Sequence, residues 1–241
     1  MDKRDIMKIV DLTNLKPMAS KKDIKDLFDK AVENECASVC VAPAMVSVAK
    51  QIRDKYIEEN GSCNVKICTV IGFPNGYNTT TIKCKETECA IIDGADEVDV
   101  VVNIGTVKEH DFESVYNEFA AIRKVADGDY GRDIIVKMIM ETCYLDEGEI
   151  RELCRVADES AIDFVKTSTG FGNPTDGRPS GATIETIAII MDEVNKINNT
   201  IENKLDGRVL KVKASGGIRD FFFASQLIEM GVSRIGASNL K

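Results

Sequence analysis

Three lysines interrupt runs of apolar residues that are typical of buried strands. They are Lys137 within 134–140, Lys166 within 161–167 and Lys213 within 209–214. A buried ammonium is unfavourable unless it is paired or loses its proton. One such lysine is readily explained as a structural ion pair, or as a stem that extends to solvent, which we expect of Lys211 at the start of its strand. Three buried lysines on consecutive strands are harder to explain as structural ion pairs and favour a chemical role.

That role is nucleophilic catalysis by a free amine. With a reference pKa of about 10.4, roughly one lysine in a few thousand is neutral at pH 7. A second ammonium ~5 Å away, at an effective dielectric constant of about 20, opposes protonation by roughly 3 kcal/mol, or a little over two pKa units. Desolvation acts in the same direction. Paired lysines on adjacent strands therefore suit an enzyme that forms a Schiff base, whose iminium ion stabilises the carbanion left when a C–C bond breaks.

Carboxylates that could pair with these lysines occur in similar apolar runs. Asp99 lies in the run 97–103, where the alternating valines 98, 100 and 102 would face helices and leave Asp99 pointing inward. Asp11 is a second inward candidate, and Glu141 ends the run that contains Lys137. Each of them could equally be a structural ion-pair partner. Asp99 could also move protons, directly or through water.

Metal chemistry finds little support in the sequence. His110 is the only histidine, it lies among polar residues, and no Cys-x-x-Cys motif occurs. A metal-dependent aldolase would need histidine ligands that this chain lacks, so we expect no metal and no other cofactor. The eight cysteines lie mostly in apolar or helical stretches and are expected to be reduced thiols.

The charge and hydropathy of the chain argue against nucleic acid and membranes as binding partners. The net charge of −9 provides no basic face for nucleic acid. No run approaches the ~20 apolar residues of a membrane span. Residues 1–5 are polar and precede no apolar stretch, so we expect no secretory signal and a cytoplasmic location.

Two glycine-containing segments suggest a phosphate site. Ser215–Arg219 follows the seventh expected strand and Gly236–Asn239 follows the eighth. Barrel enzymes often bind phosphate with backbone N–H groups of these two loops. Local N–H dipoles can hold an anion even in an acidic protein, because distant charges are screened over ~10 Å.

These residues would be positioned by alternating strands and helices in a single domain, residues 1–241. We expect strands at 9–12, 38–41, 65–73, 97–103, 134–140, 161–167, 209–214 and 233–236. Helices are expected at 21–35, 44–59, 79–92, 113–125, 147–157, 183–197 and 221–230. Eight strand–helix units of roughly 30 residues predict an α/β fold, a TIM (β/α)8 barrel. A doubly wound open sheet is the alternative, but its usual glycine fingerprint is absent after the first strand.

Several long motifs resemble those of the 2-deoxyribose-5-phosphate aldolases, a family of lysine-dependent class I aldolases. The most specific are Val165–Phe171 (VKTSTGF) and Val212–Arg219 (VKASGGIR). Cys68–Pro74, Gly94–Val101 and Lys137–Thr142 support them. The resemblance extends from Asp11 to Ser238 and implies reversible cleavage of 2-deoxy-D-ribose 5-phosphate to D-glyceraldehyde 3-phosphate and acetaldehyde, in deoxyribonucleoside breakdown.

The resemblance also implies residue roles. Lys166 matches the Schiff-base lysine, Lys213 the lysine that perturbs it and Asp99 the proton-relay aspartate. The phosphate-binding loops match Gly170, Gly216, Gly217, Gly236 and Ser238, and further candidates for substrate contact are Asp11, Thr13, Cys40, Lys137 and Thr167. The expected partner is a small phosphosugar. The family includes dimers and tetramers, so a homo-oligomer is compatible with the sequence.

Three features depart from the family pattern. Some members end in a tyrosine that assists proton transfer, and here no tyrosine follows the eighth strand. We therefore expect either that water and Asp99 do that work or that the sequence is truncated. The loop after Gly170 is longer than is common. Phe171 stands where some members place a phosphate-facing lysine, for which Arg178 or Arg219 could compensate.

Two alternative functions stay open. One is another Schiff-base barrel aldolase with a different pair of aldehydes, which only a substrate panel separates. The other is a phosphate-metabolite-binding barrel without lyase activity, in which Lys166 would form no covalent adduct.

Overall fold

Eight parallel strands close into a barrel in the order β1 to β8. The computed structural model describes residues 2–200 and 208–241. The strands are β1 (Val10–Asn14), β2 (Ser38–Val41), β3 (Lys66–Ile71), β4 (Glu97–Val101), β5 (Ile135–Ile139), β6 (Phe164–Lys166), β7 (Lys211–Ser215) and β8 (Arg234–Ala237). β8 pairs with β1, with Asp11 opposite Gly236, so the sheet is closed. The predicted TIM barrel is confirmed, and the open-sheet alternative is wrong.

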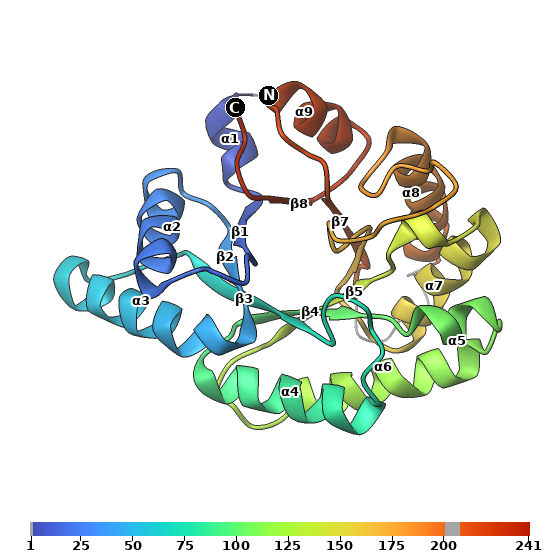
Figure 1. Cartoon of the computed structure of the whole chain (residues 1–241), viewed down its shortest axis with the longest axis horizontal. Coiled ribbons are helices and arrows are strands. Elements are labelled where there is room, and N and C mark those ends of the chain that lie inside the picture. The colour runs from blue at the N-terminus through green and yellow to red at the C-terminus, as the bar shows by residue number, and fades with distance from the viewer. Residues whose placement is uncertain (1, 201–207) are drawn as a thin grey trace.

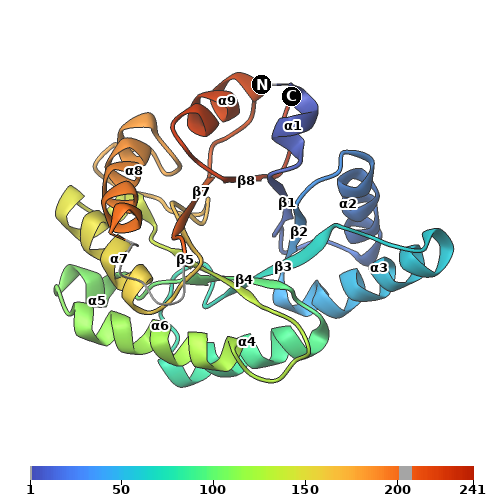
Figure 2. The same ribbon diagram turned by 180° about the vertical axis from the view of Figure 1, so that it is seen from behind.

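Helices surround this barrel (Figure 1). They are α1 (Lys3–Met7), α2 (Lys21–Glu33), α3 (Val46–Asn60), α4 (Thr80–Asp93), α5 (Ile104–Lys108), α6 (Phe112–Ala126), α7 (Glu147–Glu159), α8 (Ile184–Asn199) and α9 (Phe221–Glu229), with 3-10 turns at Pro43–Met45 and Thr142–Tyr144. The reverse view shows α1 and α9 next to each other (Figure 2). None of the described helices is long and apolar enough to cross a membrane.

Local sequence signals explain where the helices begin. α2 starts after Ser20, whose side chain accepts from the Asp23 N–H while the Asp23 carboxylate accepts from the Ser20 N–H. Asp146 and Glu149 form the same reciprocal cap on α7. Such capping boxes satisfy helix N–H groups that have no partner within the helix. They fix the register in which each apolar face meets the barrel.

The alternation of β4 is as predicted. Val98, Val100 and Val102 are fully buried in the main core between strands and helices. Asp99 is equally buried but points into the barrel, where it meets lysines from three other strands. The outer core therefore stabilises the fold, while the interior is left for polar side chains.

Two expectations about the elements need correction. β6 begins at Phe164 rather than Ala161, because Ala161 has a φ of 59° in the turn that ends α7. β3 ends at Ile71 rather than Phe73, since Gly72 turns the chain with a φ of 62°. The helices α1 and α5, of five residues each, were not predicted.

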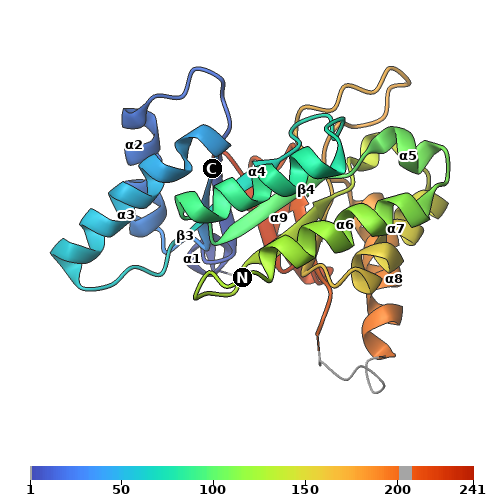
Figure 3. The same ribbon diagram turned by 90° about the horizontal axis from the view of Figure 1, so that it is seen from below.

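The loops that follow the strands gather at one end of the barrel. Figure 3 shows the loops after β1 and β6 projecting from the same end, opposite the C-terminal end of α8. Active sites of TIM barrels lie at this carboxyl end of the strands.

Candidate active site

Asp99 is the centre of the barrel interior. Its Oδ2 accepts from the Nζ of Lys166 at 2.8 Å and from the Nζ of Lys213 at 2.7 Å. Its Oδ1 accepts from the Nζ of Lys137 at 2.8 Å and from the thiol of Cys68 at 3.2 Å. The structure thus brings the three predicted inward lysines together on the predicted carboxylate.

The register of the strands explains why the three lysines converge on Asp99. Asp99 is the Cα partner of Lys137 on β5, and Lys166 is the partner of Lys213 on β7. Residues in register on adjacent parallel strands point to the same face of a sheet. The oxygen that Lys166 and Lys213 share holds their nitrogens about as close as the ~5 Å assumed from sequence.

Further charges extend the network toward the amino end of the barrel. Asp11 accepts from Lys213 and, at 2.6 Å, from Arg234. Glu97 pairs with Lys137 at 2.5 Å and with Arg234 at 3.2 Å. Sequence reasoning missed Glu97, Arg234 and Cys68. Glu97 shares the alternation of Asp99 and could have been found by that signal.

The charges of this network shift its pKa values. Burial opposes ionisation of Asp99, but the ammonium groups of Lys137, Lys166 and Lys213 outweigh it and hold the pKa of Asp99 well below its usual range. Burial likewise opposes the charge on Lys213, but Asp11 and Asp99 raise the pKa of Lys213 above its ordinary value. Lys213 is therefore a fixed cation beside Lys166.

A cavity of about 390 Å³, called the main cavity below, opens above this network. Among its walls are seven predicted residues: Thr13, Lys166, Gly170, Gly216, Gly217, Gly236 and Ser238. Lys166 is the one inner lysine in the described lining, while Lys137 and Lys213 lie beneath it with 0% and 1% exposure. Of the three lysines, Lys166 is thus the one presented to a ligand.

Other predicted residues lie below the cavity wall. Asp11, Cys40 and Lys137 are buried in the interior and are not part of the described lining. Thr167 is buried too, and its hydroxyl donates to the Ser215 carbonyl at 3.0 Å. From these positions they can support the side chains that contact the ligand, but they do not line the cavity themselves. Sequence reasoning did not single out Thr169 and Leu15, which do line the cavity.

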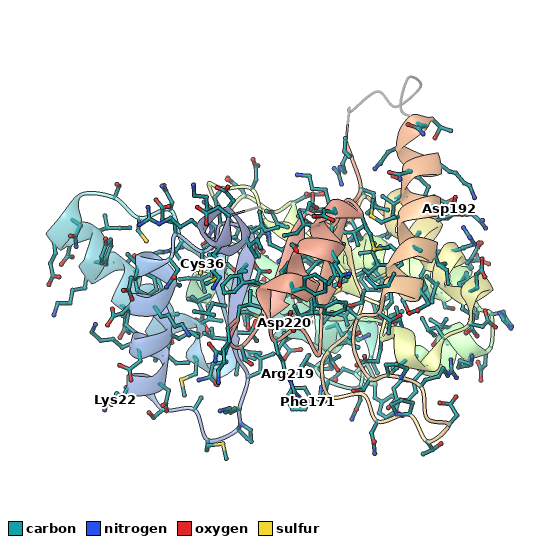
Figure 4. The ribbon with its side chains drawn as sticks, turned by 90° about the horizontal axis from the view of Figure 1, so that it is seen from above. Lys22, Cys36, Phe171, Asp192, Arg219 and Asp220 are labelled. Carbon is teal, nitrogen blue, oxygen red and sulfur yellow. The ribbon has the colours of Figure 1, made fainter. Side chains whose placement is uncertain are left out.

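One wall of the main cavity suits an anion. Gly216 and Gly217 adopt φ values of 84° and 76°, which L side chains rarely take. A Cβ at Gly216 would lie 3.0 Å from the Cα of Gly181, so only glycine fits between these loops. Lys16 and Arg219 add positive charge to the lining. Figure 4 shows Arg219 near Phe171, toward one end of the barrel.

Arg178 forms its contacts outside the main cavity. Its guanidinium pairs with Asp176 at 2.6 Å and donates to the Leu145 carbonyl at 2.9 Å. Of the two arginines considered as replacements for a phosphate-facing lysine, Arg219 is the one that lines the main cavity.

Two clusters of potential metal ligands lie inside the network. They are Cys40, Cys68 and Asp99, and Asp11, Cys68 and Glu97, and within each cluster the ligand atoms lie within 4.8 Å of one another. Three lysines already bond to Asp99, and Lys137, Lys213 and Arg234 pair with Asp11 and Glu97, so the surrounding positive charge makes both positions unfavourable for a cation. His110 is exposed on the surface, as expected, and the eight cysteines are free.

Comparison with known proteins gives one consistent result. The sequence profile of the DeoC/LacD family of aldolases matches residues 6–238. The deoxyribose-phosphate aldolase of Thermococcus kodakarensis is 43% identical over 99% of this chain and 95% of its own length. That of Clostridioides difficile is 40% identical over 98% and 94%. The tetrameric deoxyribose phosphate aldolase of Aeropyrum pernix has a TM-score of 0.79 at 29% identity, covering 98% of this chain and 87% of its own.

Proposed function

The chain belongs to the DeoC/LacD family of aldolases, and we propose that it cleaves 2-deoxy-D-ribose 5-phosphate reversibly to D-glyceraldehyde 3-phosphate and acetaldehyde through a Schiff base on Lys166. The observation that carries the proposal is the arrangement around Asp99. Lys166 lines the main cavity, while Lys213 shares the same carboxylate oxygen from beneath.

The first step needs the free amine of Lys166. The described network contains four basic side chains, Lys137, Lys166, Lys213 and Arg234, and three acidic ones, Asp11, Glu97 and Asp99. With the amine of Lys166 neutral, three cations face three carboxylates.

The amine attacks C1 of the open-chain sugar, and loss of water gives an iminium ion. The C2–C3 bond then breaks, its electron pair moves through C2 toward the iminium nitrogen, and an enamine forms. Asp99, directly or through water, accepts the proton of the C3 hydroxyl as that carbon becomes the aldehyde of glyceraldehyde 3-phosphate. The enamine is protonated at C2, and water hydrolyses the resulting iminium ion to release acetaldehyde and the amine of Lys166.

The phosphate would lie against the glycine-containing wall of the main cavity. The backbone of Gly216 and Gly217 can approach its oxygens, and the hydroxyl of Ser238 and the charge of Arg219 add to the binding. Binding energy from this remote group positions C1 against the amine.

The proposed function also includes the kind of substrate, the cellular location and the oligomeric state. The substrate is a free phosphosugar, with no nucleic acid or membrane involved. The protein works in the cytoplasm, which its eight free thiols favour. It forms a homo-oligomer, as the Aeropyrum pernix relative does.

Borohydride trapping with 2-deoxyribose 5-phosphate, followed by peptide mass mapping, tests the proposal. We expect a reduced adduct on Lys166. An adduct on Lys213 or Lys137 would keep the reaction class and overturn the assignment of the nucleophile. If the folded protein binds the sugar phosphate without an adduct, it is a binding barrel. A panel of aldehydes then separates this reaction from that of an aldolase with another aldehyde pair.

A further inference from the structure

Glu141 is buried just beyond the carboxyl end of β5, with 1% of its surface exposed. Met138 and Met140 belong to the core between strands and helices. The alternate residues Ile139 and Glu141 therefore point toward the barrel interior. Ile139 is the Cα partner of Lys166 on β6. Glu141 thus follows that partner by two residues on the same face, about 7 Å farther toward the carboxyl end.

The side chain of Glu141 holds the loop that follows Lys166. Its Oε2 accepts from the Thr169 N–H at 3.2 Å and from the Thr169 hydroxyl, which itself accepts from the Phe171 N–H at 2.9 Å. Thr169 and Phe171 line both the main cavity and a second cavity of about 400 Å³, whose walls include Glu141 and Tyr144. The groups around Oε2 are donors, as an ionised carboxylate requires.

Glu141 differs from the other buried carboxylates, because they have a cation beside them. The ones that pair with a lysine or an arginine are Asp11, Asp96, Glu97, Asp99, Glu118, Glu149 and Glu193. In the part of the chain that the structure describes, the side chain of Glu141 bonds to Thr169 and Cys143 and to no cation. Lys108, on the wall of the same second cavity, bonds to Glu149 at 2.8 Å instead. Since an unpaired buried charge is unfavourable, we expect its partner to arrive with a ligand.

The backbone of Glu141 also sets it apart. Its φ is 57°, in the left-handed region that residues other than glycine seldom adopt. Among the described residues, the other non-glycine residues with a positive φ are Glu35, His110 and Ala161, and each lies two positions after the last residue of a helix. A left-handed residue is usual at that position, where it ends the helix. Glu141 follows a strand at the cavity, and strain at such a place is retained where function requires it.

The Schiff base supplies a cation without a counter-charge. With a neutral Lys166 amine, the described network around Asp99 holds three cations and three carboxylates. The amine and the C1 carbonyl then take up one proton and give the iminium ion and one water, so the site gains one positive charge. The charge of Lys166 acts on Glu141: burial raises the pKa of the Glu141 carboxyl above its ordinary value, while the bonds from Thr169 and the ammonium of Lys166 oppose that rise.

We propose that Glu141 is the counter-ion of the Schiff base: its carboxylate offsets the positive charge of the iminium ion on Lys166, and its bonds to Thr169 hold it at the cavity wall. This inference rests on the proposed function, because it concerns the intermediate of that reaction. In this role Glu141 neither bonds to the substrate nor exchanges a proton with it. It raises the fraction of the enzyme that carries the iminium ion.

Glu141→Gln removes the charge and keeps the shape of the side chain. Because one oxygen, Oε2, accepts both bonds from Thr169, the amide oxygen of glutamine can replace it. Glu193→Gln is the matched control. Glu193 is also a buried carboxylate, but it lies on α8 and pairs with Arg151 and Arg155, which keep other acidic partners when it is replaced.

The experiment compares covalent and non-covalent binding. The initial rate of borohydride reduction of Lys166 at saturating 2-deoxyribose 5-phosphate reports the iminium ion, and the inhibition constant of inorganic phosphate reports the shape of the cavity without a Schiff base. Opposite charges about 7 Å apart, at an effective dielectric constant of about 20, can change an equilibrium about 50-fold. We expect Glu141→Gln to lower the reduction rate and kcat by about 10- to 50-fold, with phosphate inhibition within about twofold of wild type. Glu193→Gln should stay within about twofold in all three.

Thermal unfolding of the ligand-free protein gives a second readout. Because Glu141→Gln removes an unpaired buried charge, its Tm should equal or exceed that of wild type. A lower Tm, or failure to fold, would show that the fold itself needs this charge and would overturn the inference.

Two kinetic results would also overturn the inference while leaving the proposed function intact. In one, Glu141→Gln reduces and cleaves at the wild-type rate. In the other, phosphate inhibition weakens as much as the reduction rate falls, which is the signature of a distorted loop. Absence of any adduct in wild type would instead refute the proposed function, and the inference with it.

Discussion

Replacing Lys213 by leucine tests the electrostatic basis of the nucleophile. Lys213 and Lys166 bond to the same oxygen of Asp99, and Lys213 is held as a cation by Asp11 and Asp99. Two charges about 5 Å apart at an effective dielectric constant of about 20 repel by roughly 3 kcal/mol. Leucine at position 213 removes this repulsion. The pH at which kcat/KM reaches half its maximum should rise by about two units, and activity at pH 7 should fall about 100-fold.

The assay is cleavage of 2-deoxyribose 5-phosphate between pH 5 and 10, with circular dichroism to verify the fold. Lys211→Leu is the matched control, because Lys211 lies on the same strand but is exposed and stacks on Phe164 at 5.6 Å. Its profile should match that of wild type. A Lys213→Leu profile that keeps its midpoint, whatever its height, would refute the electrostatic role of Lys213.

Four further outcomes follow from the same geometry. Lys166→Ala should lower cleavage by at least about 10⁴-fold while thermal unfolding stays cooperative; substantial residual cleavage would place the nucleophile elsewhere. Asp99→Asn should reduce kcat by about 10² to 10⁴-fold, and an unchanged kcat would exclude Asp99 from proton transfer. Gly216→Ala, at a φ of 84°, should raise KM for the phosphosugar about tenfold, as initial rates would show; an unaltered KM would remove this loop from phosphate binding. Because the pKa values of Asp11 and Asp99 are depressed in the folded protein, their contribution to the free energy of unfolding is complete above about pH 5 and is lost as the pH falls; urea titrations at pH 6 and pH 3 that gave equal stability would contradict this.

The barrel could be predicted from sequence because its strands are apolar on both faces. Polar residues within such runs, above all Lys137, Lys166 and Asp99, therefore stood out as inward-pointing. The short helices α1 and α5 could not be predicted, since five residues span little more than one helical turn and show no periodicity.

The rest of the candidate site depends on contacts between distant segments. Arg234 looked like an ordinary charge at the start of β8, and only barrel closure places it against Asp11 and Glu97. Likewise, Phe171 and Tyr144 come from different loops, and nothing in their local sequence indicates that they face the same cavity. The alternation of residues along one strand predicts which side chains point into the barrel. It does not predict which side chains from different strands meet across the interior.

The ion pairs inside the barrel also constrain how the chain reaches its native state. Asp11 on β1 bonds to Lys213 on β7 and Arg234 on β8, two cations that lie more than 200 residues later in the sequence. A nascent chain that lacks these last two strands leaves Asp11 with only the Ser38 hydroxyl at 2.7 Å and the more distant ammonium of Lys137 at 3.9 Å, which offset the burial of a carboxylate less than the two missing cations do. Early collapse of an incomplete barrel is thereby disfavoured. We expect ring closure, a step of very high contact order, to set the folding rate and to make folding all-or-none for the interior.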